Sequence, residues 1–154
     1  TGKNGKIIVP CEAKDYVTVT LRKSRNPDRD SKEDEWRKFA ERCDRKVLFI
    51  REYEEVQLDL EDRMKLYAGA YMNLMVINGP LTLCIHSDAP YISMRTIGSD
   101  KSGSTSPWHM RQVGIAEGFQ FPWAGPRQRL SYLDDTADNI LREYRALTEN
   151  RMAA

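Results

Sequence analysis

Two spacings of apolar residues recur along this chain: short runs typical of buried strands, and stripes at three- and four-residue intervals typical of helices. Residues 16–21 alternate, with Val17, Val19 and Leu21 on one face. The runs 47–50 and 74–77 are apolar throughout, as strands covered on both faces are. Residues 91–94 form a fourth run. We therefore expect four main strands, with a short fifth strand in 118–123.

Helical stripes alternate with these runs. Ser31 precedes the first stripe and Asp59 the second, and both residue types cap helices well. A short helix over 81–87 is expected behind Pro80, and the last helix starts near Asp134 and Asp135, which we interpret as its caps. The stripes consist of Trp36, Phe39, Ala40 and Cys43; of Leu60, Met64, Tyr67, Ala68 and Tyr71; and of Ala137, Ile140, Leu141, Tyr144 and Leu147.

The alternation of strands and helices predicts the fold class. Right-handed crossovers between successive strands place the strands parallel to one another and the helices on both faces. We expect a three-layer, doubly wound, mostly parallel α/β sheet of the Rossmann-like kind. Residues 1–14 are interpreted as an N-terminal arm or linker, and residues 15–154 as a single α/β nucleotide-binding-like domain.

Composition narrows the function classes. A formal net charge of +1 over 154 residues gives no broad basic field for a nucleic acid, and no apolar run approaches the roughly 20 residues that cross a bilayer. Cys11, Cys43 and Cys84 are odd in number and far apart, which favours reduced thiols and a cytoplasmic location. Because the chain opens on Thr1, we expect that it was processed or cut from a longer protein.

Candidate binding residues follow two of the predicted strands, at the edge where parallel sheets bind ligands. Gly79, in Asn78-Gly79-Pro80, permits close approach to a phosphate, and the N–H groups up to Leu81 open a helix. The same three residues also make a good strand-to-helix turn. Arg22 and Lys23 follow the first strand and could clamp a diphosphate. The alternative is a solvated loop balanced by nearby acidic residues, which is favoured for Lys23 more than for Arg22.

The sequence presents no catalytic constellation. His86 lies in an apolar segment that suggests a core histidine, and His109 has no triad partners nearby in the sequence. Neither a metal-ligand set nor a Gly-rich dinucleotide or P-loop motif is present. The Gly- and Ser-rich residues 101–107 are interpreted as a mobile loop rather than a lid. The catalytic residues are therefore unknown, and no metal or other cofactor is expected.

One arrangement of motifs resembles a known family. The strand 16–21 ending in Arg22, the run 62–70, and Asn78-Gly79-Pro80 opening a helix resemble the C-terminal, donor-binding half of GT-B glycosyltransferases, in particular the heptosyltransferase-like group. The resemblance implies a nucleotide diphosphate sugar as ligand and metal-independent transfer. The phosphate-binding residues that it implies are Arg22, Lys23, Asn78, Gly79, Pro80 and Leu81, with Gln120, Trp123 and Gln128 as additional donor contacts.

The resemblance also sets limits. Thr82 and Leu83 stand where the family has a histidine, and the N-terminal acceptor domain that supplies the catalytic base in the family is missing from this chain. We therefore expect a domain that binds its ligand but is inactive alone. Two alternatives are a non-catalytic Rossmann-like module for a nucleotide or phosphorylated metabolite, and a scaffold domain whose sheet edge binds a protein.

Overall fold

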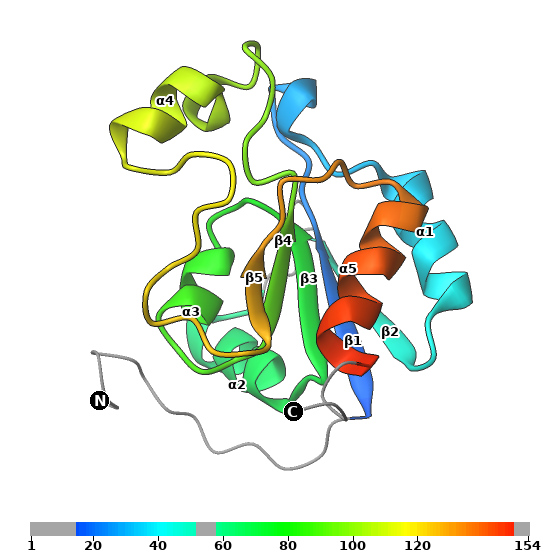
Figure 1. Cartoon of the computed structure of the whole chain (residues 1–154). Coiled ribbons are helices and arrows are strands. Elements are labelled where there is room, and N and C mark those ends of the chain that lie inside the picture. Colours follow the sequence, from blue (N-terminus) through cyan, green and yellow to red (C-terminus); the bar gives the residue numbers. More distant parts are fainter. Residues whose placement is uncertain (1–14, 52–57, 150–154) are drawn as a thin grey trace.

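The computed structural model describes residues 15–51 and 58–149, and these residues contain one five-stranded sheet in which every pairing is parallel. The strand order is β2-β1-β3-β4-β5 (Figure 1). The predicted arm, residues 1–14, lies outside the described residues. The strands are β1 (Tyr16–Leu21), β2 (Lys46–Arg51), β3 (Met72–Val76), β4 (Tyr91–Met94) and β5 (Gln128–Leu130).

Helices cover both faces of the sheet (Figure 1). Helices α1 and α5 pack on one face, and α2 and α3 lie on the other. The prediction of a three-layer, doubly wound α/β domain is confirmed. The α-helices are α1 (Glu33–Arg42), α2 (Leu60–Gly69), α3 (Leu81–Ile85), α4 (Pro107–Gln112) and α5 (Ala137–Glu149), and the short 3₁₀ helices are η2 (Pro27–Arg29) and η3 (Gly103–Thr105).

The core consists of two apolar clusters, one on each face of the sheet. Trp36 and Phe39 of α1 are fully buried, as their stripe predicts, and Phe39 meets Tyr144 of α5 edge to face at 5.7 Å between ring centroids. On the opposite face, Tyr67 of α2 and Leu81 of α3 are buried against β3 and β4. Burial on both faces explains why the runs 47–50 and 74–77 are apolar without alternation.

Two details at helix N-termini differ from expectation. Ser31 does not cap α1, because its Oγ accepts from the Arg22 N–H at 2.8 Å, and Lys32 occupies the cap position without a side-chain bond. Asp59 caps α2 as predicted, accepting from Asp62 N–H at 2.8 Å. Leu60 is 70% exposed rather than buried. Arg63 is buried instead, where its guanidinium donates to the Tyr67 hydroxyl at 3.4 Å.

The fifth strand was predicted in 118–123, but the structure has it at Gln128–Leu130. Gly118 adopts a φ of 93°, which breaks an extended run before Gln120. The Gln120 side-chain amide donates to the Leu130 carbonyl and accepts from the Leu130 N–H, both at 2.7 Å. Gln120 thus occupies the backbone groups of an edge strand that has no strand beyond it in the described sheet.

Candidate functional site

The strand order reverses between β1 and β3, and in doubly wound sheets the crevice at this point is where ligands bind. Arg22 follows β1 directly, and its Nη1 donates to the carbonyl of Ile77, just beyond β3, at 3.1 Å. This bond links the carboxyl ends of the two strands. The structure therefore brings Arg22 and the turn beginning at Asn78 to the same edge, although they are 56 positions apart in the sequence.

The backbone of Arg22 is fixed as firmly as its side chain. Its N–H donates to Ser31 Oγ at 2.8 Å, and its carbonyl accepts from the Ser31 N–H at 3.0 Å. A hollow of about 230 Å³ lies here between the end of β1 and the start of α1. Its walls carry two basic and two acidic side chains, so it is not uniformly positive. The lining residues are Leu21, Arg22, Lys23, Asp30, Ser31 and Glu33.

The Asn78-Gly79-Pro80 turn departs in part from the predicted phosphate loop. Asn78 Oδ1 accepts from the Leu81 N–H at 3.0 Å, so that N–H is already used, and α3 has only five residues. The start of α3 therefore carries no part of the site. The Asn78 side chain is buried, and its Nδ2 has no hydrogen-bond partner among the described residues. A Cβ added at Gly79 would meet nothing within 4 Å, so the turn is open above its backbone.

The three additional residues inferred from the family resemblance lie away from this crevice or are already engaged. Gln128 begins β5 at the opposite, amino edge, and its buried amide donates to the carbonyls of Ser87 and Ala89 at 3.0 and 2.8 Å. Trp123 donates to the Ile85 carbonyl at 2.9 Å. The Gln120 amide nitrogen and oxygen are both hydrogen-bonded to the backbone of Leu130. The structure gives each a role in packing the sheet.

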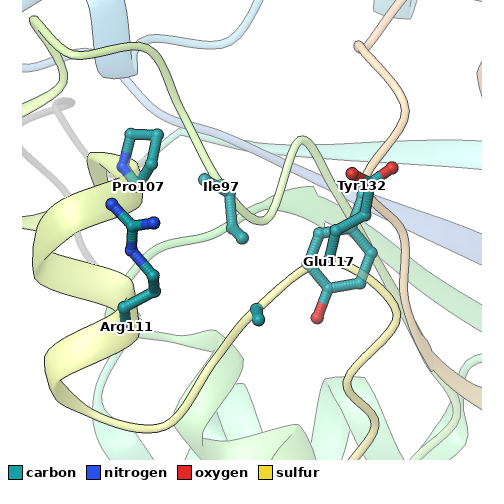
Figure 2. A pocket seen from close by; sticks show the side chains of 6 residues that line it. Ile97, Pro107, Arg111, Glu117 and Tyr132 are labelled. Carbon is teal, nitrogen blue, oxygen red and sulfur yellow. The ribbon is translucent and has the colours of Figure 1, made fainter.

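A second and larger hollow, of about 350 Å³, lies beyond the ends of β4 and β5 (Figure 2). Arg111 of α4 and Pro107 stand on one side, and Tyr132 and Glu117 stand on the other. Burial and the negative charge of Glu117 raise the pKa of the Tyr132 hydroxyl. Sequence reasoning assigned no function to the residues of this hollow, because they come from segments without a motif. The lining residues are Ile97, Pro107, Arg111, Ala116, Glu117 and Tyr132.

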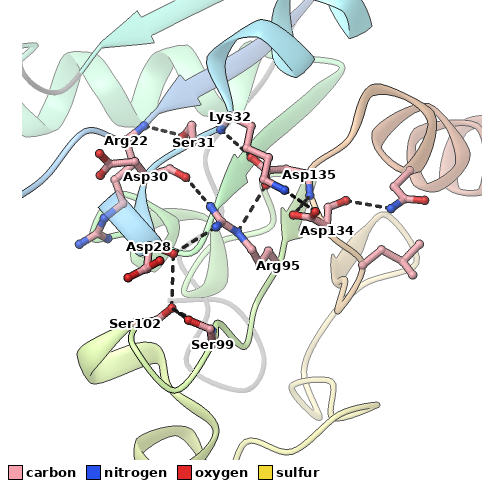
Figure 3. Close-up of polar contacts among 12 residues, drawn as sticks. Arg22, Asp28, Asp30, Ser31, Lys32, Arg95, Ser99, Ser102, Asp134 and Asp135 are labelled. Carbon is pink, nitrogen blue, oxygen red and sulfur yellow. Dashed lines mark hydrogen bonds and ion pairs between the residues drawn. The ribbon is translucent and has the colours of Figure 1, made fainter. Parts of the chain in front are cut away.

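A buried polar network beside the crevice was also missed (Figure 3). Arg95, directly after β4, adopts a φ of 47° and donates from Nη1 to the Asp28 carbonyl at 3.1 Å and from Nη2 to the Asp30 carbonyl. Its Nε lies 3.4 Å from Asp135 Oδ1. Arg95 thereby holds the loop after β1 against β4. The signal that pointed to Arg22, a basic residue directly after a strand, applies equally to Arg95.

Asp134 and Asp135 were predicted to cap α5, and this prediction is wrong. Asp135 Oδ2 accepts from the Lys32 N–H and from the Trp36 indole N–H, both at 2.9 Å. Burial raises the pKa of Asp135, and these bonds and the charge of Arg95 offset the effect only in part. Burial acts on Asp134 in the same direction, but the hydrogen bonds from Lys32 and Asp135 and the positive charge of Lys32 together outweigh it and lower the pKa of Asp134. The Thr136 hydroxyl accepts from the Asn139 N–H at 3.3 Å and takes the capping role.

The segment predicted as a mobile loop is bonded to itself and to the loop after β1. Gly98 N–H donates to the Thr105 carbonyl at 2.8 Å, and Ser102 Oγ accepts from the Ser99 N–H at 2.9 Å. Asn26 Nδ2 donates to the Lys101 carbonyl at 2.9 Å. The segment contains η3 and leads into α4. Its serine and threonine hydroxyls therefore serve local turns, as Ser and Thr commonly do, and the Ser102 hydroxyl also donates to the Asp28 carbonyl at 3.3 Å.

Neither histidine joins a catalytic arrangement. His86 is exposed and stacks on Trp123 at 6.2 Å, so the prediction of a core histidine is wrong. His109 Nδ1 and Ser106 Oγ are 2.8 Å apart, but Ser106 is buried as the cap of α4. Within residues 15–51 and 58–149, no group of three potential metal-ligating side chains occurs. None of the helices described there is long and apolar enough to cross a membrane.

The fold and this edge define the class: a doubly wound, parallel α/β domain with one of the two common strand orders and a switch point between β1 and β3. No family model, no curated protein sequence and no solved structure matches the chain. The function must therefore be inferred from the site itself.

Proposed function

We propose that this chain is the donor-binding domain of a glycosyltransferase, and that it binds the diphosphate of a nucleotide sugar at the switch point between β1 and β3. One observation carries the proposal. The Arg22 guanidinium is anchored on the Ile77 carbonyl where the strand order reverses, next to the buried Asn78 amide, whose Nδ2 has no partner in the described structure.

Each part of this arrangement suits a phosphate. A guanidinium binds phosphate oxygens through parallel N–H bonds, and the bond from Nη1 to Ile77 fixes the orientation of its plane. A buried amide N–H₂ without an acceptor is costly, and a phosphate oxygen would supply that acceptor to Asn78. The open backbone at Gly79 leaves room for the ligand to approach. The choice of a sugar nucleotide among phosphate ligands rests on the family resemblance.

The proposal assigns binding, and not turnover, to this chain alone. The catalytic base would come from an acceptor-binding domain that faces the crevice. The proposal includes no metal ion or cofactor: the Arg22 guanidinium would offset part of the charge of the diphosphate, and the Asn78 amide would donate a hydrogen bond to it.

Replacing Arg22 is expected to weaken nucleotide binding about tenfold to a hundredfold, the effect of losing one charge-assisted phosphate contact worth about 1–3 kcal/mol. The experiment is a calorimetric titration of the folded domain with ADP, GDP and UDP and the corresponding nucleotide sugars, repeated with Arg22→Ala. Asn78→Asp provides a second variant, because aspartate keeps the acceptor for Leu81 N–H but removes the donor and adds a negative charge. It should also weaken binding.

Arg25→Ala is the matched control, since Arg25 is an exposed arginine of the same loop that does not line the hollow. Equal losses for Arg22→Ala and Arg25→Ala would reduce the effect to general charge and contradict the proposed site. No heat with any nucleotide would overturn nucleotide binding. Nucleotide sugars that bind no more tightly than the bare nucleotides would favour the alternative of a non-catalytic nucleotide module.

A further inference from the structure

The hollow between α4 and Tyr132 carries two charges that no described side chain neutralises. Neither Arg111 nor Glu117 forms an ion pair or a side-chain hydrogen bond with any residue of the described chain, although both line the same space. In Figure 2 the two side chains stand on opposite sides of the hollow.

The remaining walls are apolar and include a fixed aromatic ring. Ile97, Pro107 and Ala116 supply aliphatic surface. The Tyr132 hydroxyl donates to the Phe119 carbonyl at 2.7 Å, which holds the ring in place and uses its polar atom. The hollow thus offers a flat apolar surface between one donor-only group and one acceptor-only group.

Size and charge restrict the ligand. A volume of about 350 Å³ is at the small end of ligand pockets, which hold about 300–1,000 Å³, so a single ring fits better than a whole nucleotide. The charges of Arg111 and Glu117 cancel, which favours a neutral ligand over an acid or an amine. A hydroxyl both donates and accepts, so neighbouring hydroxyls can satisfy the guanidinium and the carboxylate together. The C–H face of the same ring can pack on Tyr132.

We propose that this hollow, formed by Arg111, Glu117 and Tyr132 over the apolar surface of Ile97 and Pro107, binds a neutral pyranose ring through neighbouring hydroxyls. This inference rests on the proposed function in that it gives a glycosyltransferase domain its sugar subsite. It names a neutral hexose as the class of sugar bound.

The test uses sugars without any nucleotide, so that it does not depend on the switch point. The methyl pyranosides of glucose, galactose and mannose are titrated into the isotope-labelled chain and followed by two-dimensional NMR. Saturable shifts of Tyr132 and of the α4 amides are expected for at least one pyranoside, with a dissociation constant in the millimolar range. Glucuronate, glucosamine and adenosine serve as acidic, basic and nucleoside comparison ligands.

Arg111→Gln and Glu117→Gln are each expected to weaken pyranoside binding about tenfold, the loss of a hydrogen bond to a charged group. Both residues are exposed, so the variants should keep the fold. Gln112→Ala, the exposed neighbour of Arg111 outside the hollow, is the matched control and should bind as the unaltered chain does. Arg22→Ala should also leave pyranoside binding unchanged.

Three results would overturn the inference: no saturable shift with any pyranoside, equal binding by the two glutamine variants and the unaltered chain, or tighter binding of a charged sugar or of adenosine. The two proposals can fail separately. If nucleotides bind in a way that depends on Arg22 but no pyranoside binds, only the sugar subsite is contradicted. If a pyranoside binds in a way that depends on Arg111 and Glu117 but no nucleotide binds, only the nucleotide site at the switch point is contradicted.

Discussion

Replacing Asp135 with alanine is expected to lower the free energy of unfolding by about 3–5 kcal/mol, the usual effect of removing one partner of a buried ion pair. Asp135 is 0% exposed, and its carboxylate accepts from the Lys32 backbone and the Trp36 indole while facing Arg95. Alanine leaves the buried Trp36 indole N–H and the partly buried Lys32 N–H without an acceptor and removes the counter-charge of Arg95. Chemical denaturation followed by circular dichroism would measure the loss.

Asp135→Asn is the matched variant, because asparagine is the same size and keeps an oxygen for Lys32 and Trp36. The charge is lost and an amide NH2 replaces the oxygen opposite Arg95, but the two hydrogen bonds are kept, so we expect a clearly smaller loss than for alanine. If the two variants are equally destabilised, the hydrogen bonds contribute little and the charge dominates. A loss below about 1 kcal/mol for alanine, the level of an exposed pair, would contradict the buried network.

Asn73→Ala is expected to lower the free energy of unfolding by about 2–4 kcal/mol, because it removes three buried hydrogen bonds, each worth about 0.5–1.5 kcal/mol, and leaves the Thr18 hydroxyl without its acceptor. Asn73 lies in β3 and is 0% exposed. Its Nδ2 donates to the carbonyls of Tyr67 and Pro90 at 2.8 Å, and its Oδ1 accepts from the Thr18 hydroxyl at 2.6 Å. One amide thus joins β1, the end of α2 and the start of β4.

A double-mutant cycle with Thr18→Val isolates one of these bonds. Thr18→Val alone should cost about 1–3 kcal/mol, because it leaves Asn73 Oδ1 unpaired in the core. In the Asn73→Ala background the same change should cost much less, because the partner is already gone. Strictly additive losses in urea denaturation would show that the two side chains do not interact as the structure indicates.

Local sequence determined the framework of the domain. The runs 16–21, 47–50, 74–77 and 91–94 are strands to within two residues at each end, since alternating apolar residues mark a strand with one apolar face and continuous ones a strand covered on both faces. The stripe of Trp36 and Phe39 became the buried face of α1. Arg22 and Asn78 were also expected at one edge because each follows a predicted strand, and the bond from Arg22 to the Ile77 carbonyl joins those two strand ends.

Tertiary structure decided which of the candidate polar groups remain available to bind a ligand. The Ser31 hydroxyl, the Leu81 N–H and the Gln128 amide could each cap a helix or bind a ligand, but they are bonded to Arg22, to Asn78 and to distant carbonyls. Arg95 and Asp135 lie 40 positions apart, and Arg111 and Tyr132 lie in segments without a motif. A sequence pattern records the period of one element, whereas a buried ion pair or a hollow depends on where several elements meet in space.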